Sequence, residues 1–153
     1  MSEANEQLAR RWFEEVWNKQ NSSAIDEMFS AQGKSHGIPN PDSVLQGPED
    51  FKILHSNFCG AFPDIHITVE DVITEGNKVA VRWLATMTHL GDHLGIPASG
   101  RKVTLAGSCF LTVEDGKILD GWNFMEMQAM LQSLKGGSPS ESESYPRSAS
   151  TTV

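Results

Sequence analysis

One carboxylate near the end of the folded region stands in aromatic surroundings. Glu126 closes a segment in which Ile118, Trp122 and Phe124 share its parity, so all four side chains lie on one face if the segment is a strand. If that face lines a cavity, the carboxyl projects among aromatic groups, where it could exchange protons with a bound molecule. The alternative is that Glu126 caps or solvates the strand end.

Two histidines could assist a proton transfer. His36 lies in a polar stretch and could donate to a substrate carbonyl; the alternative is a surface histidine. His89 shares the parity of Trp83 and Met87, which predicts a place at the mouth of the same pocket. Alternatively, His89 only ends the strand by bonding the turn at Gly91.

The segment from residue 89 to 93 could suggest a metal site, because imidazole and carboxylate bind zinc or iron. His89, Asp92 and His93 nevertheless lie in a loop broken by glycine, with no third convergent ligand evident. We expect no metal. His55 and His66 suit solvent or an interface.

Aromatic residues at helix and strand spacing usually form the core. Trp12, Trp17, Trp83 and Trp122 follow this spacing. Trp83 and Trp122 could also wall a pocket for a planar polycyclic ligand. The complete set of expected ligand contacts is Trp83, His89, Trp122, Phe124, Phe58 and Met87.

Helical periodicity dominates the first part of the chain. Residues 7–17 predict an amphipathic helix, and Asn21 and Ser22 are suited to cap a second short helix that carries Ile25, Met28 and Phe29. Residues 31–46 lose this periodicity and indicate an irregular loop. A third helix begins at Pro48 and ends near residue 60.

Alternating apolar residues dominate the second part. They predict one hairpin from residues 65–69 and 79–87 and another from residues 102–113 and 118–126. Residues 127–134 indicate a last short helix. We therefore expect an α+β domain, with helices first and a curved antiparallel sheet after, around an apolar pocket.

The composition is that of one soluble globular domain of 153 residues. A net charge of −8 without a basic run argues against a nucleic acid or membrane partner. The N-terminal sequence lacks an apolar signal region, and we expect a cytoplasmic protein. Cys59 and Cys109 lack the short spacing of a zinc or redox motif, and we expect buried thiols, with a disulfide as the alternative.

The last residues differ from the rest of the chain. From residue 137 the sequence SPSESESYPRSASTTV is rich in Ser and almost without apolar residues. Such composition is typical of a disordered tail. The expected organisation is one domain over residues 1–136 and a tail over residues 137–153.

Several motifs in one order resemble the SnoaL-like polyketide cyclases of the larger NTF2-like fold. The motifs cover residues 7 to about 136 and are, in chain order, ARRWFEEVWN, His36, GPEDF, Phe62-Pro63-Asp64, VAVRWLATMTHLG, HLGIPASGRKV, FLTVEDGKILDGW and MLQSLKG. The resemblance implies a cone of helices against a strongly bent sheet, a hydrophobic cavity, and a homodimer through the outer face of the sheet.

The resemblance also implies a reaction. Members of the family with known activity close rings on polyketides by an intramolecular aldol condensation, without a metal or cofactor. The family's acid/base Asp lies four residues after a Trp on the last strand, and here Glu126 holds that position relative to Trp122. Glu126 is then the catalytic acid/base, and His36 assists it.

Three functions remain open at this point, and the third of them is an interaction domain that dimerises through the outer face of the sheet. The first is a cyclase-type enzyme, or a related isomerase, that acts on a hydrophobic carbonyl-rich molecule. The second is a non-catalytic protein that binds a small apolar ligand, which the longer Glu in place of Asp favours. A fold by itself cannot separate them.

Overall fold

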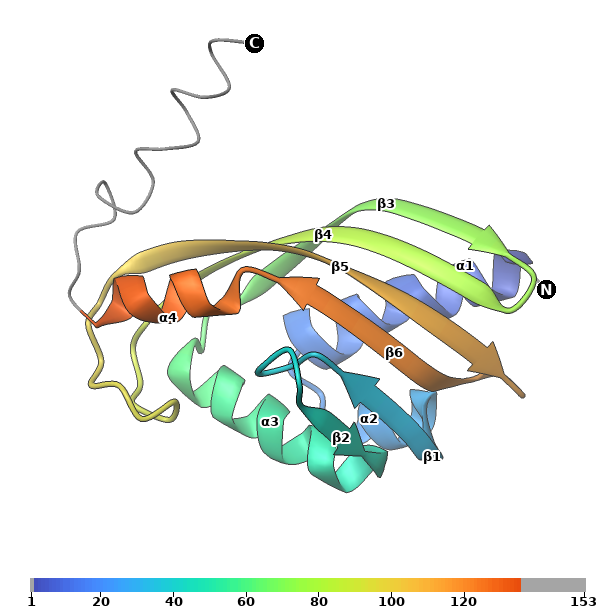
Figure 1. Cartoon of the computed structure of the whole chain (residues 1–153), viewed down its shortest axis with the longest axis horizontal. Helices are drawn as coiled ribbons and strands as arrows, with labels where there is room; N and C mark the ends of the chain where they lie inside the picture. The colour runs from blue at the N-terminus through green and yellow to red at the C-terminus, as the bar shows by residue number, and fades with distance from the viewer. Residues whose placement is uncertain (1, 136–153) are drawn as a thin grey trace, which may run out of the picture.

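A single curved sheet of six strands forms the body of the protein in the computed structural model, which describes residues 2–135 (Figure 1). The strand order across the sheet is β2-β1-β6-β5-β4-β3. The expected tail and its boundary at residue 136 lie outside the described residues. The strands are β1 (Phe29–His36), β2 (Val44–Gln46), β3 (His66–Glu75), β4 (Lys78–Thr88), β5 (Lys102–Glu114) and β6 (Lys117–Met125).

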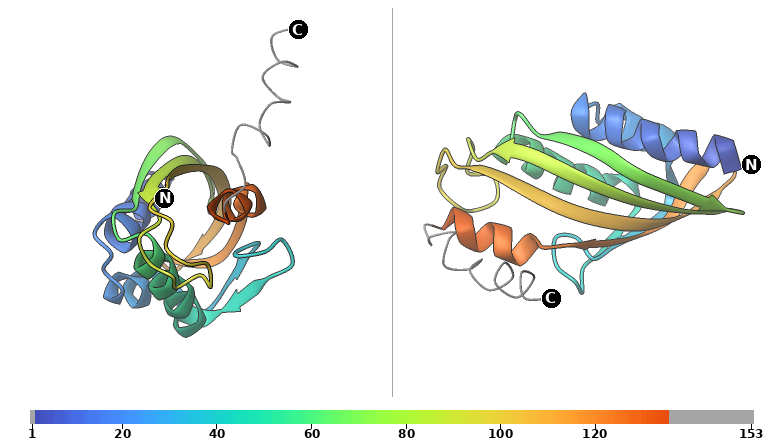
Figure 2. Two further views of the ribbon diagram at one scale, coloured as in Figure 1. Left: turned by 90° about the vertical axis from the view of Figure 1, so that its left-hand side faces the viewer. Right: turned by 90° about the horizontal axis from the view of Figure 1, so that it is seen from above.

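The helices cover one side of this sheet and one of its ends. They are α1 (Ser2–Arg11), η1 (Trp12–Asn18), α2 (Ser23–Met28), α3 (Gly47–Ala61) and α4 (Met127–Leu134). Seen along its length, the sheet curls around an interior that α3 and the first helices close (Figure 2). The predicted α+β class, with helices packed on a curved sheet, is confirmed.

The first helix is longer than predicted and changes its winding. α1 continues into η1, a π-helical segment in which the Lys19 amide donates to the Glu14 carbonyl five residues earlier, at 2.9 Å. Its apolar residues Trp12, Phe13, Val16 and Trp17 are buried.

A buried hydrogen bond ties this segment to α3. His55 Nε2 lies 2.6 Å from the carbonyl oxygen of Val16, near the end of η1. Carbonyls at a helix end have no partner within the helix, and a buried one needs a donor from elsewhere. His55 is only 4% exposed and supplies that donor. Its predicted place in solvent or an interface is wrong.

The expected loop over residues 31–46 contains two strands. β1 starts at Phe29, a residue predicted to end the second helix, and pairs with β6 in parallel. β2 then returns antiparallel beside β1, with His36 opposite Val44. β1 is concealed in the sequence because, after Phe29, its buried positions hold Gly33 and Ser35 and no apolar side chain. The expected antiparallel sheet therefore contains one parallel pair.

The two long hairpins agree with the prediction. β3 pairs with β4 and β5 with β6, both antiparallel, and β4 pairs with β5 over its whole length. On β4 the alternate residues Val79, Val81, Trp83, Ala85 and Met87 are buried against the helices. Alternating burial of this kind is typical of a sheet with one face on the core.

Both cysteines are free in the structure: Cys109 is buried and Cys59 is partly buried. No helix within residues 2–135 is long and apolar enough to cross a membrane.

The His55 contact generates a pH prediction. Burial lowers the pKa of His55 from its ordinary value of 6.5, against an opposing effect of the Val16 carbonyl. The folded chain therefore holds this imidazole neutral, whereas the unfolded chain binds a proton as the pH falls below about 6.5. We expect the free energy of unfolding to decrease as the pH falls through that range.

The measurement is urea unfolding at several pH values. His55→Leu should lose about 1–3 kcal/mol at pH 8, because the Val16 carbonyl stays buried without a donor. As the pH falls, the free energy of unfolding of the variant should also decrease less than that of wild type. His66→Gln, at an exposed histidine, is the matched control and should retain both. An unchanged pH profile in His55→Leu would contradict the assignment.

Candidate functional site

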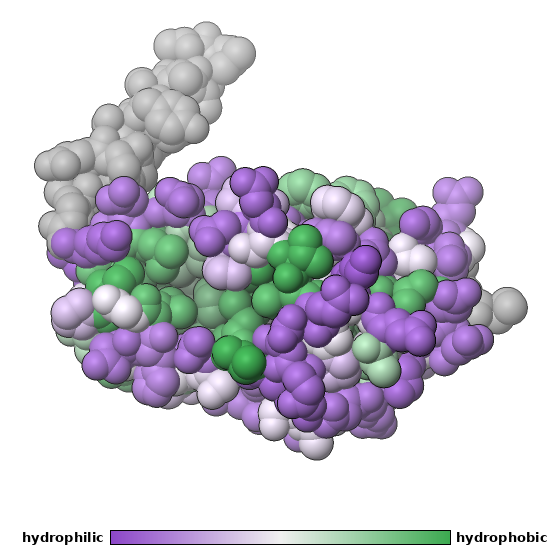
Figure 3. Space-filling view, turned by 60° about the horizontal axis from the view of Figure 1, so that its bottom comes forward, coloured by the Kyte–Doolittle hydropathy of each residue, from purple (hydrophilic) through white to green (hydrophobic). Residues whose placement is uncertain are grey.

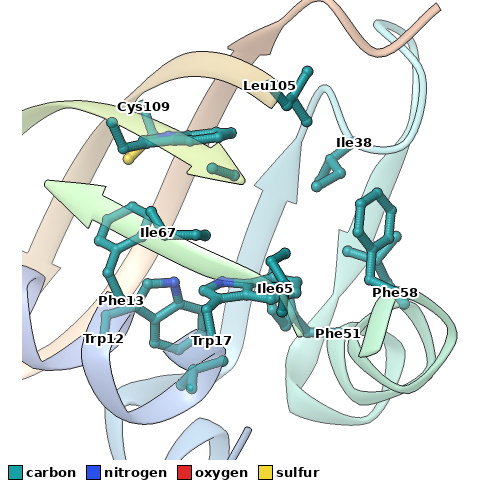
Figure 4. Close-up of a cluster of buried hydrophobic side chains, with 14 of the residues drawn as sticks. Trp12, Phe13, Trp17, Ile38, Phe51, Phe58, Ile65, Ile67, Leu105 and Cys109 are labelled. Carbon is teal, nitrogen blue, oxygen red and sulfur yellow. The ribbon is translucent and has the colours of Figure 1, made fainter. Parts of the chain in front are cut away.

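An apolar cavity of about 60 Å³ lies between the helices and the inner face of the sheet. Side chains from η1, α3, β3 and β5 converge on it (Figure 4). The residues that line it are Trp12, Phe13, Trp17, Phe29, Ser35, Ile38, Phe51, Phe58, Ile65, Ile67, Trp83, Ala85, Met87, Leu105, Cys109, Leu111, Ile118, Gly121, Asn123 and Met125. Within residues 2–135 this wall contains no Asp, Glu, His, Lys or Arg.

Two hydrogen-bonding side chains face this apolar interior. Asn123 Nδ2 donates to the carbonyl of His36 at 2.9 Å and to Ser35 Oγ at 3.0 Å. Since a carbonyl can only accept, these bonds fix which end of the Asn123 amide is the nitrogen. The Ser35 hydroxyl proton and Asn123 Oδ1 are not used in them. The pair can therefore offer a ligand one donor and one acceptor.

The wall also carries the indole N–H groups of three tryptophans and one thiol. Cys109 is the direct cross-strand partner of Asn123 in the β5–β6 pairing. Burial raises the pKa of the Cys109 thiol to about 12. It therefore stays a neutral thiol near pH 7 and contacts a ligand as a small apolar group, because a nucleophilic cysteine requires the thiolate.

The side chains of β6 alternate differently from the sequence prediction. Thr112 pairs with Asp120, but the next residue of β5, Val113, pairs with Ile118, so Leu119 is an extra residue in β6. Such a bulge reverses which face the following side chains occupy. Ile118 still faces inward, but beyond the bulge the inward residues are Gly121, Asn123 and Met125.

The predicted orientation of three site residues is therefore wrong. Trp122 is 48% exposed, Phe124 is 55% exposed, and Glu126 is exposed as well. None of these three lines the cavity. Asn123, whose side chain has the opposite parity, lies on the wall instead.

One sequence signal indicated the bulge. Gly121 interrupts the apolar alternation of β6, and an isolated glycine inside a strand is typical of a bulge or a close approach. A Cβ atom at Gly121 would lie 3.3 Å from Leu111 Cδ2. Ser35 carried no comparable signal, because β1 was not recognised as a strand.

His36 belongs to the outer face of the sheet. Its ring stacks on Trp122 with 3.9 Å between centroids, and its Nε2 lies 2.8 Å from Asp120 Oδ1. Trp122 Nε1 donates to the other carboxylate oxygen of Asp120 at 2.8 Å. The pair of His36 and Asp120 resembles the oriented imidazole of a general base, but it faces away from the cavity.

Beside this cluster lies a groove of about 690 Å³ on the outer face. Trp122, Phe124 and Glu126 line it, together with the loop after β1 and the first residues of α4. On the side of the molecule that carries α3, apolar side chains also gather in a hollow between polar margins (Figure 3). Glu126 and Trp122 thus share this outer groove, whereas the expected contacts Phe58, Trp83 and Met87 line the cavity.

His89 holds a loop and does not line the cavity. It is 0% exposed, and its Nδ1 accepts from the Ser99 amide at 3.2 Å and lies 2.9 Å from Ser99 Oγ. Its backbone pairs with Arg101 and Gly100. These bonds close the base of the loop between β4 and β5. Within residues 2–135 no group of three His, Cys, Asp or Glu side chains could hold a metal ion.

Comparison with known families identifies the chain. The model of the SnoaL-like polyketide cyclase family matches residues 7–134, and the chain belongs to this family. A comparison with curated proteins finds no significant match.

Solved structures share the fold. A protein of Jannaschia sp. CCS1, named as a SnoaL-like polyketide cyclase, has a TM-score of 0.80 at 24% identity, over 90% of this chain and 95% of its own. AclR of Streptomyces galilaeus, named as a hydroxylase, has 0.78 at 24% identity, over 90% and 100%. IdmH of Streptomyces antibioticus, named as a polyketide cyclase, has 0.72 at 23% identity, over 85% and 97%.

The bulge can be tested with two neighbouring substitutions. Met125→Lys should place a charge at the cavity wall and cost at least about 2–3 kcal/mol of unfolding free energy. Phe124→Lys should change it by less than about 1 kcal/mol, because that side chain already meets solvent. Urea unfolding of both variants measures the difference. If Phe124→Lys were the more destabilising of the two substitutions, the side chains of β6 would alternate without a bulge.

Proposed function

We propose that this chain is a cyclase-type enzyme without a cofactor, which binds a small hydrophobic molecule with a carbonyl or hydroxyl group in the inner cavity. Membership of the family supports the reaction class. The ligand class rests on one observation: apart from the indole N–H groups of Trp12, Trp17 and Trp83, the apolar wall contains one hydrogen-bonding pair, Ser35 and Asn123.

This pair suits one polar group on an otherwise apolar ligand. Apolar surface supplies most of the binding free energy of such a site, and a few polar groups fix the orientation. The Ser35 hydroxyl can donate to a ligand carbonyl, and Asn123 Oδ1 can accept from a ligand hydroxyl. A polar group of the ligand that finds no partner in this apolar cavity would lower the affinity, because it loses its hydrogen bonds to water.

An aldol closure needs two kinds of catalytic group from the protein. A base removes a proton from a carbon flanked by carbonyls, and a donor stabilises the oxyanion that forms on the attacked carbonyl. The Ser35 hydroxyl is suited to be the second. For the first, the sequence suggested Glu126 and His36, but neither lines the cavity: Glu126 lies in the outer groove and His36 stacks on Trp122 at the outer face.

Binding without turnover is the second candidate function. The observation that favours it is the wall of the cavity, which within residues 2–135 carries no carboxylate or imidazole. Mass spectrometry of any molecule that co-purifies with the protein separates the two functions, because an enzyme alters that molecule during incubation and a binding protein returns it unchanged.

The polar pair predicts a preference between two probes of similar size. Wild type should bind phenol more tightly than toluene, because phenol can bond Asn123 Oδ1 and Ser35. Asn123→Leu should lower the phenol affinity about tenfold and leave toluene nearly unchanged, since one hydrogen bond is worth about 1 kcal/mol. NMR titration of both probes measures the two affinities.

Ser35→Ala is the milder second variant, and Glu126→Gln is the control. Glu126→Gln should bind both probes as wild type does, because its side chain lies in the outer groove. A lower phenol affinity in Glu126→Gln would mean that the carboxyl reaches the cavity. Equal phenol preference in wild type and Asn123→Leu would refute the polar pair as the anchor.

We also propose a homodimer through the outer face of the sheet. Phe110, Trp122 and Phe124 are each about half exposed on neighbouring strands, and the rings of Phe110 and Phe124 meet edge to face with centroids 6.0 Å apart. Contiguous exposed aromatic side chains are typical of interfaces. A second copy of the same face would cover them by two-fold pairing.

Phe110→Glu tests this interface. The substitution places two like charges close together across a two-fold axis and should weaken dimerisation at least tenfold, as sedimentation velocity would report. Ile73→Glu removes another exposed apolar side chain, on β3, and should leave the dimer intact. A wild-type protein that stays monomeric at high concentration would rule the interface out.

A further inference from the structure

Trp83 lies across a glycine on the cavity wall. Trp83 and Gly107 are direct partners in the β4–β5 pairing. A Cβ atom built on Gly107 would lie 2.4 Å from Trp83 Cζ2 and 2.8 Å from two further indole atoms. Since such separations are closer than van der Waals contact permits, the indole occupies the position where any other residue would carry its side chain.

The opposite side of the indole is also in contact. Phe13 of η1 packs against Trp83 with ring centroids 6.3 Å apart and an angle of 40° between the planes. The sheet and the helix together hold the ring, and Trp83 is only 6% exposed. A methyl group at residue 107 would therefore push the indole away from β5, toward the interior.

The cavity that remains is small for a site that binds organic molecules. Its volume of about 60 Å³ compares with about 150 Å³ for an engineered apolar cavity that binds benzene. A planar polycyclic ligand, which the paired tryptophans suggested, does not fit beside Trp83. Trp122, the other predicted wall, lies on the outer face.

We infer that Trp83, seated on Gly107, sets the size limit of the ligand, and that the cavity selects molecules of no more than one ring. This inference rests on the proposed binding site and specifies the size class of its ligand. One ring is the largest unit that small side-chain movements admit, whereas a second fused ring requires the indole to leave its place.

The experiment compares phenol, 2-naphthol and 2-anthrol as one-, two- and three-ring probes. Wild type should bind phenol and should bind the larger probes at least tenfold more weakly. Trp83→Phe should raise the affinity for 2-naphthol at least tenfold, because the smaller ring frees space beside Gly107. Gly107→Ala should lower the affinity for phenol at least tenfold. Binding is measured by NMR titration, with circular dichroism as the check on folding.

Ser108→Ala is the matched control for Gly107→Ala. Ser108 is the next residue of β5 and lines the outer groove, so its variant should bind all three probes as wild type does. Because Trp83→Phe and Gly107→Ala act in opposite directions, a general loss of stability cannot produce both results.

Two results would count against different statements. If wild type binds none of the probes in the cavity, the proposed binding function fails. If phenol binds but 2-anthrol binds equally well, or if neither variant changes the order of the three probes, the size limit at Trp83 is refuted while the binding site stands.

Discussion

The extra residue in β6 is the constraint on which the site depends. Because side chains alternate across a strand, an insertion of one residue exchanges the two faces for everything that follows. Leu119 is that residue. Beyond it the small and polar side chains Gly121 and Asn123 face the interior, and the aromatic side chains Trp122 and Phe124 face outward. Without the bulge, Trp122 and Phe124 would point into the space that the cavity now occupies.

The parallel pairing of β1 with β6 makes use of this arrangement. Ser35 lies opposite Gly121 and His36 lies opposite Trp122, so each face of the pair carries matching neighbours. On the inner face, Asn123 bonds Ser35 and the His36 carbonyl. On the outer face, Asp120 bonds both His36 and Trp122. One stretch of paired backbone therefore positions the polar anchor of the cavity and the polar cluster outside it.

The sequence predicted those elements whose side chains follow one period throughout. The helices over residues 7–17 and from residue 48 and the two long hairpins all have buried residues at regular spacing, and the structure has them there. β1 could not be found in this way, because after Phe29 its buried residues are Gly33 and Ser35, and neither is recognisably apolar. The prediction of the site residues was partly wrong for a related reason. Trp83, Met87 and Phe58 lie on uninterrupted elements and line the cavity, whereas every site residue inferred from unbroken parity beyond Leu119 was assigned to the wrong face.

The ionisable side chains of the candidate site lie outside the cavity that would bind the ligand. The cavity wall within residues 2–135 offers an oxyanion donor and an acceptor but no group that is charged near neutral pH, since burial keeps the Cys109 thiol protonated. The oriented imidazole of His36 and the exposed carboxylate of Glu126 both lie on the other side of the sheet, so the backbone of the sheet separates them from the cavity. An ionised proton acceptor inside the cavity would need a counter-charge to offset its desolvation, and the described wall carries no such charge. The same aromatic wall that makes the site a good binding pocket therefore makes it a poor place for an ionised base. A cyclisation here would depend chiefly on folding the substrate into a reactive shape and on the single polar anchor at Ser35 and Asn123.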